Sequence, residues 1–173
     1  FITSDAVFNM NSGEVSSNYS AKEGGGLYIT DNAVVNIKGG DFYNNKSYTN
    51  GGGIFLQSGT LTMSKIGDRK SKIRKNENGQ DGKTSANGGG VYVKNGTFTI
   101  EDGEITGNVA KGYGGGIYMG NAENEASQII IKGGAIGENS ARYGAGIFVL
   151  HGECVMTGVS IDGSIAGIGG GGV

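Results

Sequence analysis

Short segments along the chain alternate apolar and polar positions with a period of two residues. Most of their apolar residues are β-branched or aromatic, which is typical of half-buried β-strands. No stretch shows a convincing 3.6-residue period, and glycine is too frequent for helices. The pattern therefore predicts an all-β fold. The six copies of the alternating segment are Phe8–Met10, Val35–Ile37, Leu61–Met63, Phe98–Ile100, Ile129–Ile131 and Cys154–Met156.

Glycine clusters recur between these segments. An apolar residue follows each cluster and an aromatic residue usually comes next, as in Ile54 and Phe55 after Gly51 to Gly53. The clusters begin at Gly24, Gly51, Gly88, Gly114, Gly144 and Gly170. Glycine suits corners that need a positive φ or a close approach of two chains. Each cluster therefore predicts a corner, and the residues after it predict a second strand.

A third pattern places asparagine three positions after an apolar residue. The pairs are Val15 with Asn18, Phe42 with Asn45, Ile73 with Asn76, Ile105 with Asn108 and Ile136 with Asn139, while Ser164 follows Ile161. Asparagine tolerates a left-handed backbone at turns, and stacked amides can bond to one another as in cross-β structures. We therefore predict a third strand and a structural asparagine ladder. Small residues two positions further on fit a tight corner: Ser20, Ser47, Ala110, Ala141 and Ala166.

The glycine cluster and the segment with asparagine three positions after an apolar residue keep the same register along the chain, which indicates a true repeat. A unit of three short strands cannot bury both ends of its own core, whereas a unit stacked on a copy can. We therefore expect residues 1–173 to form a single right-handed parallel β-helix of about six coils, with three short strands per coil. The inward-facing residues would be the apolar ends of the alternating segments, the apolar residues before the asparagines, and Leu27, Ile54, Val91, Ile117 and Ile147.

Composition supports this interpretation and narrows the function. The chain has 37 glycines and no proline, so its glycine does not follow the collagen pattern. A net charge of -2 argues against a nucleic-acid partner. One cysteine excludes an internal disulfide framework. No run approaches the roughly 18 apolar residues of a membrane helix, so we expect no membrane insertion of this segment. The abrupt first and last residues suggest a fragment that continues into further repeats.

The asparagine segment and the glycine cluster resemble the two repeat motifs of bacterial polymorphic outer-membrane proteins, which are Phe-x-x-Asn and Gly-Gly-Ala-(Ile/Leu/Val). Phe42 to Asn45 matches the first in full, and Gly51 to Ile54 matches the second except for one glycine. Most copies here have Ile or Val in the phenylalanine position. The resemblance implies a right-handed β-helix on a bacterial surface, often an autotransporter passenger that acts as an adhesin. We therefore expect an extracellular, non-enzymatic stalk or passenger domain that binds a protein or glycan partner.

The alternative is a carbohydrate-active β-helix enzyme, of the polysaccharide lyase or glycoside hydrolase type, or a non-catalytic segment of one. Such sites need clustered carboxylates, usually with a basic residue nearby. Glu14, Asp41 and Glu104 share one repeat position, and Glu14 and Asp41 are expected to be neighbours. Carboxylates facing a groove, with Arg or Lys within hydrogen-bonding reach, would favour the enzyme. An exposed, unbroken aromatic column without a groove would favour adhesion.

His151 and Cys154 are the only residues of their types. Cysteine and histidine together can form a nucleophile or a metal site. However, Cys154 occupies a core position of the alternating segment, and His151 is expected in a turn. We therefore predict no catalytic residue, no metal site and no cofactor here.

Two features are candidates for binding. Alternation directs the aromatic residue after each cluster outward, which would align Tyr28, Phe55, Tyr92, Tyr118 and Phe148 in one column. Such a column can bind sugars or partner proteins, or its rings can stack to support the sheet. The second candidate is a basic loop within the long third coil, which contains Lys65, Arg69, Lys70, Lys72, Arg74 and Lys75. A smaller insertion runs from Asn121 to Ser127.

Overall fold

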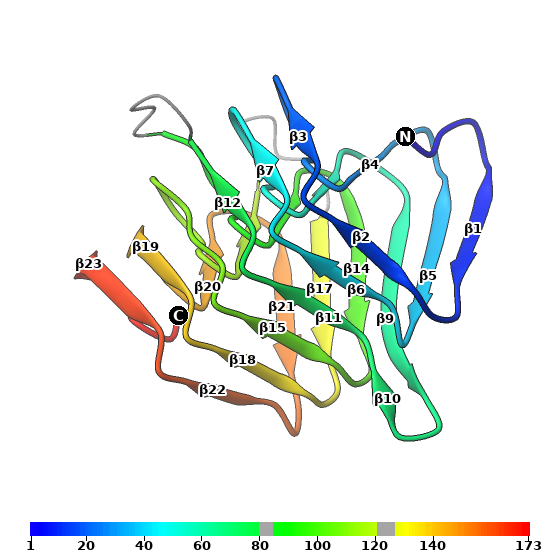
Figure 1. Ribbon diagram of the computed structural model, residues 1–173. Coiled ribbons are helices and arrows are strands. Elements are labelled where there is room, and N and C mark those ends of the chain that lie inside the picture. The colour runs from blue at the N-terminus through cyan, green and yellow to red at the C-terminus, as the bar shows by residue number, and fades with distance from the viewer. Residues whose placement is uncertain (80–84, 121–126) are drawn as a thin grey trace.

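The computed structural model describes residues 1–79, 85–120 and 127–173, and every regular element within these ranges is a β-strand. The strands stack as a parallel β-helix of about six coils, in which each coil lies beside its predecessor (Figure 1). Each full coil passes through four rows of strands, which we call sheets A to D in the order that the chain visits them.

Sheets A and B contain the strand after each glycine cluster and the alternating segment. Sheet A consists of β4 (Leu27–Ile29), β8 (Ile54–Leu56), β13 (Val91–Val93), β16 (Ile117–Met119) and β20 (Ile147–Val149). Sheet B consists of β1 (Val7–Met10), β5 (Val34–Lys38), β9 (Thr60–Ile66), β14 (Gly96–Ile100), β17 (Ser127–Ile131) and β21 (Glu153–Met156). Equivalent residues pair in register, as Val35 does with Phe8 and with Leu61.

Sheets C and D contain the segments before and after each asparagine. Sheet C consists of β2 (Glu14–Ser16), β6 (Asp41–Tyr43), β11 (Lys72–Arg74), β15 (Glu104–Thr106), β18 (Ala135–Gly137) and β22 (Ser160–Asp162). Sheet D is shorter and consists of β3 (Tyr19–Ser20), β7 (Lys46–Ser47) and β12 (Glu77–Asn78), followed by β19 (Ser140–Tyr143) and β23 (Ile165–Gly169). Single bridges through Val109 connect β12 to β19.

The fourth row corrects the expectation of three strands per coil. The small residues predicted at a tight corner lie in or beside sheet D, because the backbone after each asparagine stays extended and bonds to the next coil. Ser47 is fully buried there, and Ala110 and Ala141 are also buried. The chain turns later, at the glycine cluster. The small side chains fit against the backbone of the turn that follows, as Ser47 does by donating from Oγ to the carbonyl oxygen of Asn50 at 3.1 Å.

The core is the predicted stack of inward-facing apolar residues. Phe42, Ile73, Phe98 and Ile105 are completely buried, and the equivalent residues of the first and last coils are partly exposed. The prediction missed one inward row, which is the third residue of each sheet A strand. This row consists of Ile29, Leu56, Val93 and Met119, with Val149 partly buried. Only one position per sheet A strand had been assigned to the core, although alternation directs the third residue inward as well.

The predicted asparagine ladder is present, and it is held by side-chain hydrogen bonds. The Nδ2 atom of Asn45 donates to Oδ1 of Asn76 at 3.1 Å, and that of Asn76 donates to Oδ1 of Asn108 at 3.0 Å. Asn18 and Asn139 continue the ladder at its two ends. The left-handed residue is the one before each asparagine, as at Asn44 with a φ of 55°. The expected left-handed backbone at the asparagines themselves was therefore wrong.

The glycine clusters are corners in which a side chain has no room, as the second cluster illustrates. Gly51 has a φ of 64°, which glycine adopts without strain. A Cβ atom on Gly52 would lie 2.4 Å from the carbonyl oxygen of Gly89 in the next coil. A Cβ atom on Gly53 would lie 2.9 Å from Nδ2 of Asn76. The glycine clusters therefore allow close coil stacking and contact with the asparagine ladder.

Candidate functional site

The basic stretch from Lys65 to Lys75 is structured, which corrects the expectation of a loop. Strand β9 extends beyond the other strands of sheet B and turns at Gly67 and Asp68 into the antiparallel strand β10 (Arg69–Lys70). The chain then enters β11, where Ile73 is completely buried in the core. Figure 1 shows this hairpin projecting beyond the ends of its neighbours. The buried Ile73 and the strand pairing of β9 with β10 leave little of the stretch irregular.

Ser71 fastens the base of the hairpin to the preceding coil. Its side chain is fully buried, and its Oγ atom accepts a hydrogen bond from the backbone N–H of Gly39 at 2.8 Å. The same hydroxyl lies within hydrogen-bonding distance of the carbonyl oxygens of Ile37 and Ser64, and it can donate to one of them at a time. The hairpin is therefore anchored by a polar contact that the strand pairing alone does not provide.

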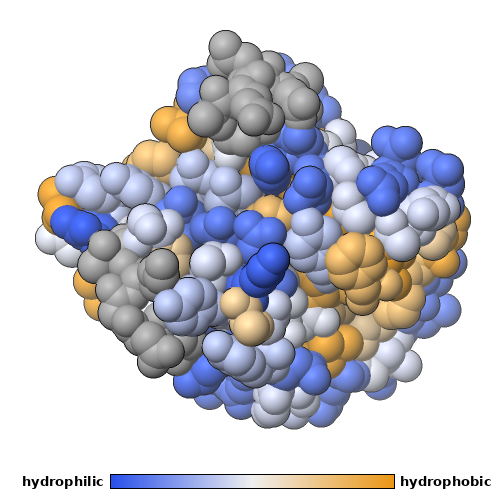
Figure 2. Space-filling model, turned by 90° about the horizontal axis from the view of Figure 1, so that it is seen from above, coloured by the Kyte–Doolittle hydropathy of each residue, from blue (hydrophilic) through white to orange (hydrophobic). Residues whose placement is uncertain are grey.

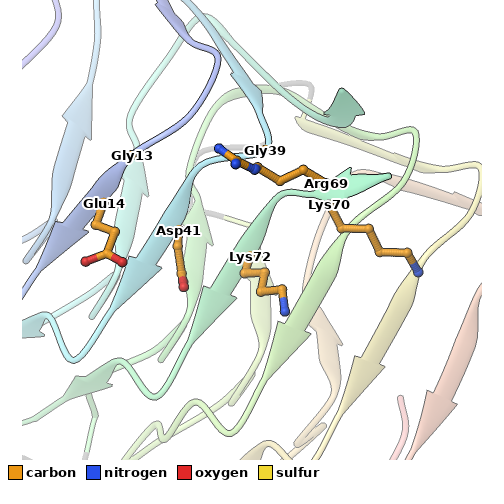
Figure 3. A pocket seen from close by; sticks show the side chains of 7 residues that line it. All are labelled: Gly13, Glu14, Gly39, Asp41, Arg69, Lys70 and Lys72. Atoms are coloured by element: carbon orange, nitrogen blue, oxygen red, sulfur yellow. The ribbon is translucent and has the colours of Figure 1, made fainter. Parts of the chain in front are cut away.

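An open hollow of about 390 Å³ lies where the hairpin meets sheet C. It is lined by Gly13, Glu14, Gly39, Asp41, Arg69, Lys70 and Lys72. Figure 3 shows Glu14, Asp41 and Lys72 on adjacent strands, while Arg69 extends from the hairpin past Gly39 and Lys70 points away from the two carboxylates. Carboxylates and cations thus share one surface depression.

The predicted acidic column is confirmed in its register. Glu14 pairs with Asp41 across β2 and β6, Asp41 pairs with Lys72, and Lys72 pairs with Glu104. The same position holds Ala135 in β18. Glu14 and Asp41 are therefore neighbours, as expected, and Lys72 separates them from Glu104.

Both carboxylates of the hollow have further partners within sheet C. The Nη2 atom of Arg74 lies 2.8 Å from Oδ2 of Asp41, and its Nε atom also donates to that carboxylate. This hydrogen bond raises the pKa of the Arg74 guanidinium. The guanidinium also lies 4.5 Å from the ring centre of Tyr43, whose hydroxyl donates to Glu14 at 2.9 Å. Asp41 is thereby held in a fixed orientation. The sequence prediction missed this contact, because it joins residues that are diagonal to each other on the sheet.

Most of the basic side chains of the hairpin region are neutralised. Lys65 lies 3.3 Å from Asp102, Lys72 lies 3.3 Å from Glu104, and Lys70 is within 4.0 Å of both carboxylates. Within the described residues, no acidic side chain forms an ion pair with Arg69 or with Lys75, and both of these side chains are exposed. The expected basic surface is therefore reduced to these two cations, and only Arg69 lines the hollow.

The aromatic column exists, although three of its rings are not available for binding. Neighbouring rings stack with centroid separations of 4.7 to 5.6 Å, in a cluster outside the main core. Phe55, Tyr92 and Tyr118 are buried, with exposures of 1%, 9% and 5%. The strand spacing of about 4.8 Å brings each ring face against the next. Only Tyr28 and Phe148, at the two ends, remain half-buried. Of the two alternatives, stacking that supports the sheet therefore describes the three central rings, which offer no exposed binding face.

The tyrosine hydroxyls of this column also have partners. The hydroxyl of Tyr92 donates to the carbonyl oxygen of Gly120 at 3.1 Å, and that of Tyr28 donates to Gln57. Burial raises the pKa of Tyr92 and of Tyr118 above the ordinary value of 10.0.

On the face seen in Figure 2, hydrophilic side chains predominate and the hydrophobic ones gather mainly on one side.

The remaining candidates lie where the sequence placed them. Cys154 pairs with Ile129 and packs against the core, and burial raises the pKa of its thiol. His151 is exposed beside β21. Among residues 1–79, 85–120 and 127–173, no group of three or more His, Cys, Asp or Glu side chains is placed to hold a metal ion. Residues 121–126 of the smaller insertion lie outside the described ranges, and Ser127 begins β17.

Comparisons with family models, with curated proteins and with solved structures find no significant match to this chain. Among the residues described, none form a helix long and apolar enough to cross a membrane.

Proposed function

We propose that this chain is a rigid, non-enzymatic segment of a bacterial cell-surface protein of the adhesin type, which presents its surface to protein or glycan partners. The observation that supports this proposal is the continuity of the ladders along the axis. Hydrogen-bonded asparagines run from Asn18 to Asn139, and stacked rings run from Tyr28 to Phe148. Because each coil bonds to the next at several places, the segment resists bending as a stalk must.

The proposal also accounts for where the coils differ. Inward positions repeat from coil to coil, whereas the hairpin of β9 and β10 occurs in one coil of the described residues and carries its own set of charges. In repeat proteins, insertions of this kind often form the binding face. Autotransporter-like export belongs to the same proposal, and it derives from the resemblance of the repeats.

A bead adhesion assay tests the proposal. The chain is attached to beads through its amino terminus, and the beads are passed over arrays of surface glycans and of extracellular proteins. We expect retention on a restricted set of these ligands, reduced by free chain added as competitor. Beads that carry only the attachment tag serve as the control. Retention no greater than that of the control beads on every ligand contradicts an adhesive function.

A carbohydrate-active enzyme is the second candidate, and one specific observation favours it. Glu14 and Asp41 line a hollow in which cations also lie, and Arg74 is within hydrogen-bonding distance of Asp41. Incubation with uronate-containing polysaccharides, followed by assays for reducing ends and for unsaturated products, tests this function. Activity that is lost in Asp41→Asn but kept in Asp162→Asn, an exposed aspartate of the same sheet, would support the enzyme. Absence of any product contradicts it.

A further inference from the structure

The hollow at the base of the hairpin combines two kinds of polar group. Glu14 and Asp41 offer carboxylate oxygens, which accept hydrogen bonds, while Arg69 offers a guanidinium without an ionic partner among the described residues. Lys72 lies between these groups and Glu104, with which it forms an ion pair. A volume of about 390 Å³ lies within the range of roughly 300–1,000 Å³ that is usual for small-molecule sites.

The position of Arg69 is set by its surroundings. Strand β10 holds its backbone by pairing Arg69 with Ile66, and Ser71 ties the end of the hairpin to Gly39. The side chain of Arg69 lies so close to Gly39 that a Cβ atom there would be 2.9 Å from its Cδ atom. Gly39 therefore leaves the space that Arg69 occupies at the edge of the hollow. The backbone of Arg69 is thus fixed, while its exposed side chain leaves the guanidinium accessible to a ligand.

The division of charge restricts the chemistry of a ligand. A guanidinium binds a carboxylate through two parallel hydrogen bonds. The carboxylates of Glu14 and Asp41 accept hydrogen bonds from hydroxyl groups, and they repel a second negative charge on the sugar unit that occupies the hollow. A sugar with one carboxylate and several hydroxyl groups satisfies both halves of the hollow. A sulfated polymer or an acidic peptide satisfies only the cationic half.

We infer that this hollow binds a uronic acid residue of an acidic polysaccharide, with Arg69 on the sugar carboxylate and with Glu14 and Asp41 on its hydroxyl groups. The inference rests on the proposed function, because it assigns a ligand class to the surface that such an adhesin presents. It requires no catalysis and no metal ion.

Titration calorimetry with trigalacturonate as the probe tests the inference. We expect saturable binding to the intact chain and much weaker binding of the neutral trigalactose. Arg69→Gln is expected to weaken binding by about tenfold or more, since the variant loses the charge-assisted hydrogen bonds to the sugar carboxylate. The affinity of Arg69→Lys for trigalacturonate is expected to lie between those of the intact chain and of Arg69→Gln, because lysine keeps the charge without the planar guanidinium.

Lys75→Gln is the matched control, because it removes one positive charge from an exposed side chain of the same coil outside the hollow. Thermal unfolding of each variant verifies that it is folded. Equal weakening by Arg69→Gln and Lys75→Gln overturns the inference, as does equally tight binding of triglutamate or of a sulfated trisaccharide. Absence of trigalacturonate binding overturns it too. Retention of the beads on other ligands would then show that the adhesive function stands without this site.

Discussion

At the scale of single residues, the asparagine ladder explains why one residue type recurs in the core. Asn76 accepts hydrogen bonds from the backbone N–H and the side chain of Asn45, and it donates to Phe42 and to Asn108. Aspartate has no amide hydrogens to donate, and alanine has neither donor nor acceptor. Because these groups are completely buried, no water replaces a missing partner.

Replacement of Asn76 by alanine therefore tests the ladder. Asn76→Ala removes the acceptor of a buried N–H and the donor to a buried carbonyl, and each such loss costs about 1 to 3 kcal/mol. We expect a loss of about 2 to 4 kcal/mol in the free energy of unfolding, measured by urea denaturation. Asn18→Ala, at the exposed end of the ladder, should cost about 1 kcal/mol or less. Equal losses in both variants would contradict the account.

Glu77 provides a test of a charge between coils. Its carboxylate lies 3.4 Å from Lys46 and 3.2 Å from Lys111. Partial burial disfavours ionisation of Glu77, but the hydrogen bonds and charges of the two lysines outweigh it and lower the pKa below its ordinary value of 4.5. A lowered folded-state pKa stabilises the fold above pH 4.5, and this contribution is lost as the pH falls through the folded-state value.

Glu77→Gln is accordingly expected to cost at most about 1 kcal/mol at neutral pH, because the carboxylate and both amines are partly exposed. The difference from the unaltered chain should shrink as the pH is lowered from about 5 to about 2. Urea denaturation across this pH range measures the difference. Glu138→Gln, which changes an exposed carboxylate without an ion pair in the described ranges, should show no such trend. A pH-independent cost of Glu77→Gln would show that its charge is not responsible.

At the scale of elements, the hairpin of β9 and β10 is the main departure from the repeat. Its base is fixed by Ser71, whose buried hydroxyl bonds to the backbone of the preceding coil at Gly39 and Ile37. The charges of the hairpin are distributed so that Asp102 and Glu104 neutralise its lysines, which leaves Arg69 over the hollow. The hairpin thus determines which of the six basic side chains between Lys65 and Lys75 lines the hollow without an ion pair.

Ser71→Ala tests the anchoring of the hairpin. We expect a loss of about 1 to 3 kcal/mol in the free energy of unfolding, since the N–H of Gly39 loses its acceptor in a buried site. Hydrogen exchange of the Gly39 amide should become faster. Ser64→Ala is a suitable control, because the Ser64 side chain is only half-buried and forms no hydrogen bond within the described residues. Equal exchange rates for the Gly39 amide in the two variants would contradict the anchoring role.

At the scale of the whole molecule, stability derives from the stacking of coils. Each coil contacts only its neighbours, so a central coil is supported on both sides and a terminal coil on one side. The difference is visible in the core, where Ile105 is completely buried whereas the equivalent Ile161 of the last coil is half-buried. Core substitutions should therefore depend on coil position more than on residue type.

Ile105→Ala is expected to lower the free energy of unfolding by about 2 to 5 kcal/mol, the usual cost of a large cavity in a packed core. Ile161→Ala makes the same chemical change and should cost distinctly less, because its site is already partly hydrated. Urea denaturation measures both, and hydrogen exchange shows whether the loss spreads to neighbouring coils. Similar losses of unfolding free energy in the two variants would contradict the view that a central coil is supported on both sides and a terminal coil on one side.

The stack, the register of its strands and most of its core follow from the amino-acid pattern alone, because the same apolar positions recur beside the same glycines and asparagines along the chain. That pattern also placed Glu14 beside Asp41, since that contact follows from register alone. A fourth row of strands was not foreseen, because the short extended segment after each asparagine has no apolar alternation of its own.

Which candidate surfaces are accessible and which charges lack an ion pair depends on the three-dimensional packing of the coils. Burial of Tyr92 and Tyr118 depends on how closely the rings of successive coils stack, which a pattern of alternation does not specify. The pairing of Arg74 with Asp41 and the isolation of Arg69 depend on the reach of side chains from different coils. Repetition makes backbone contacts predictable from one chain, whereas these side-chain contacts occur once and arise from the geometry of particular neighbours.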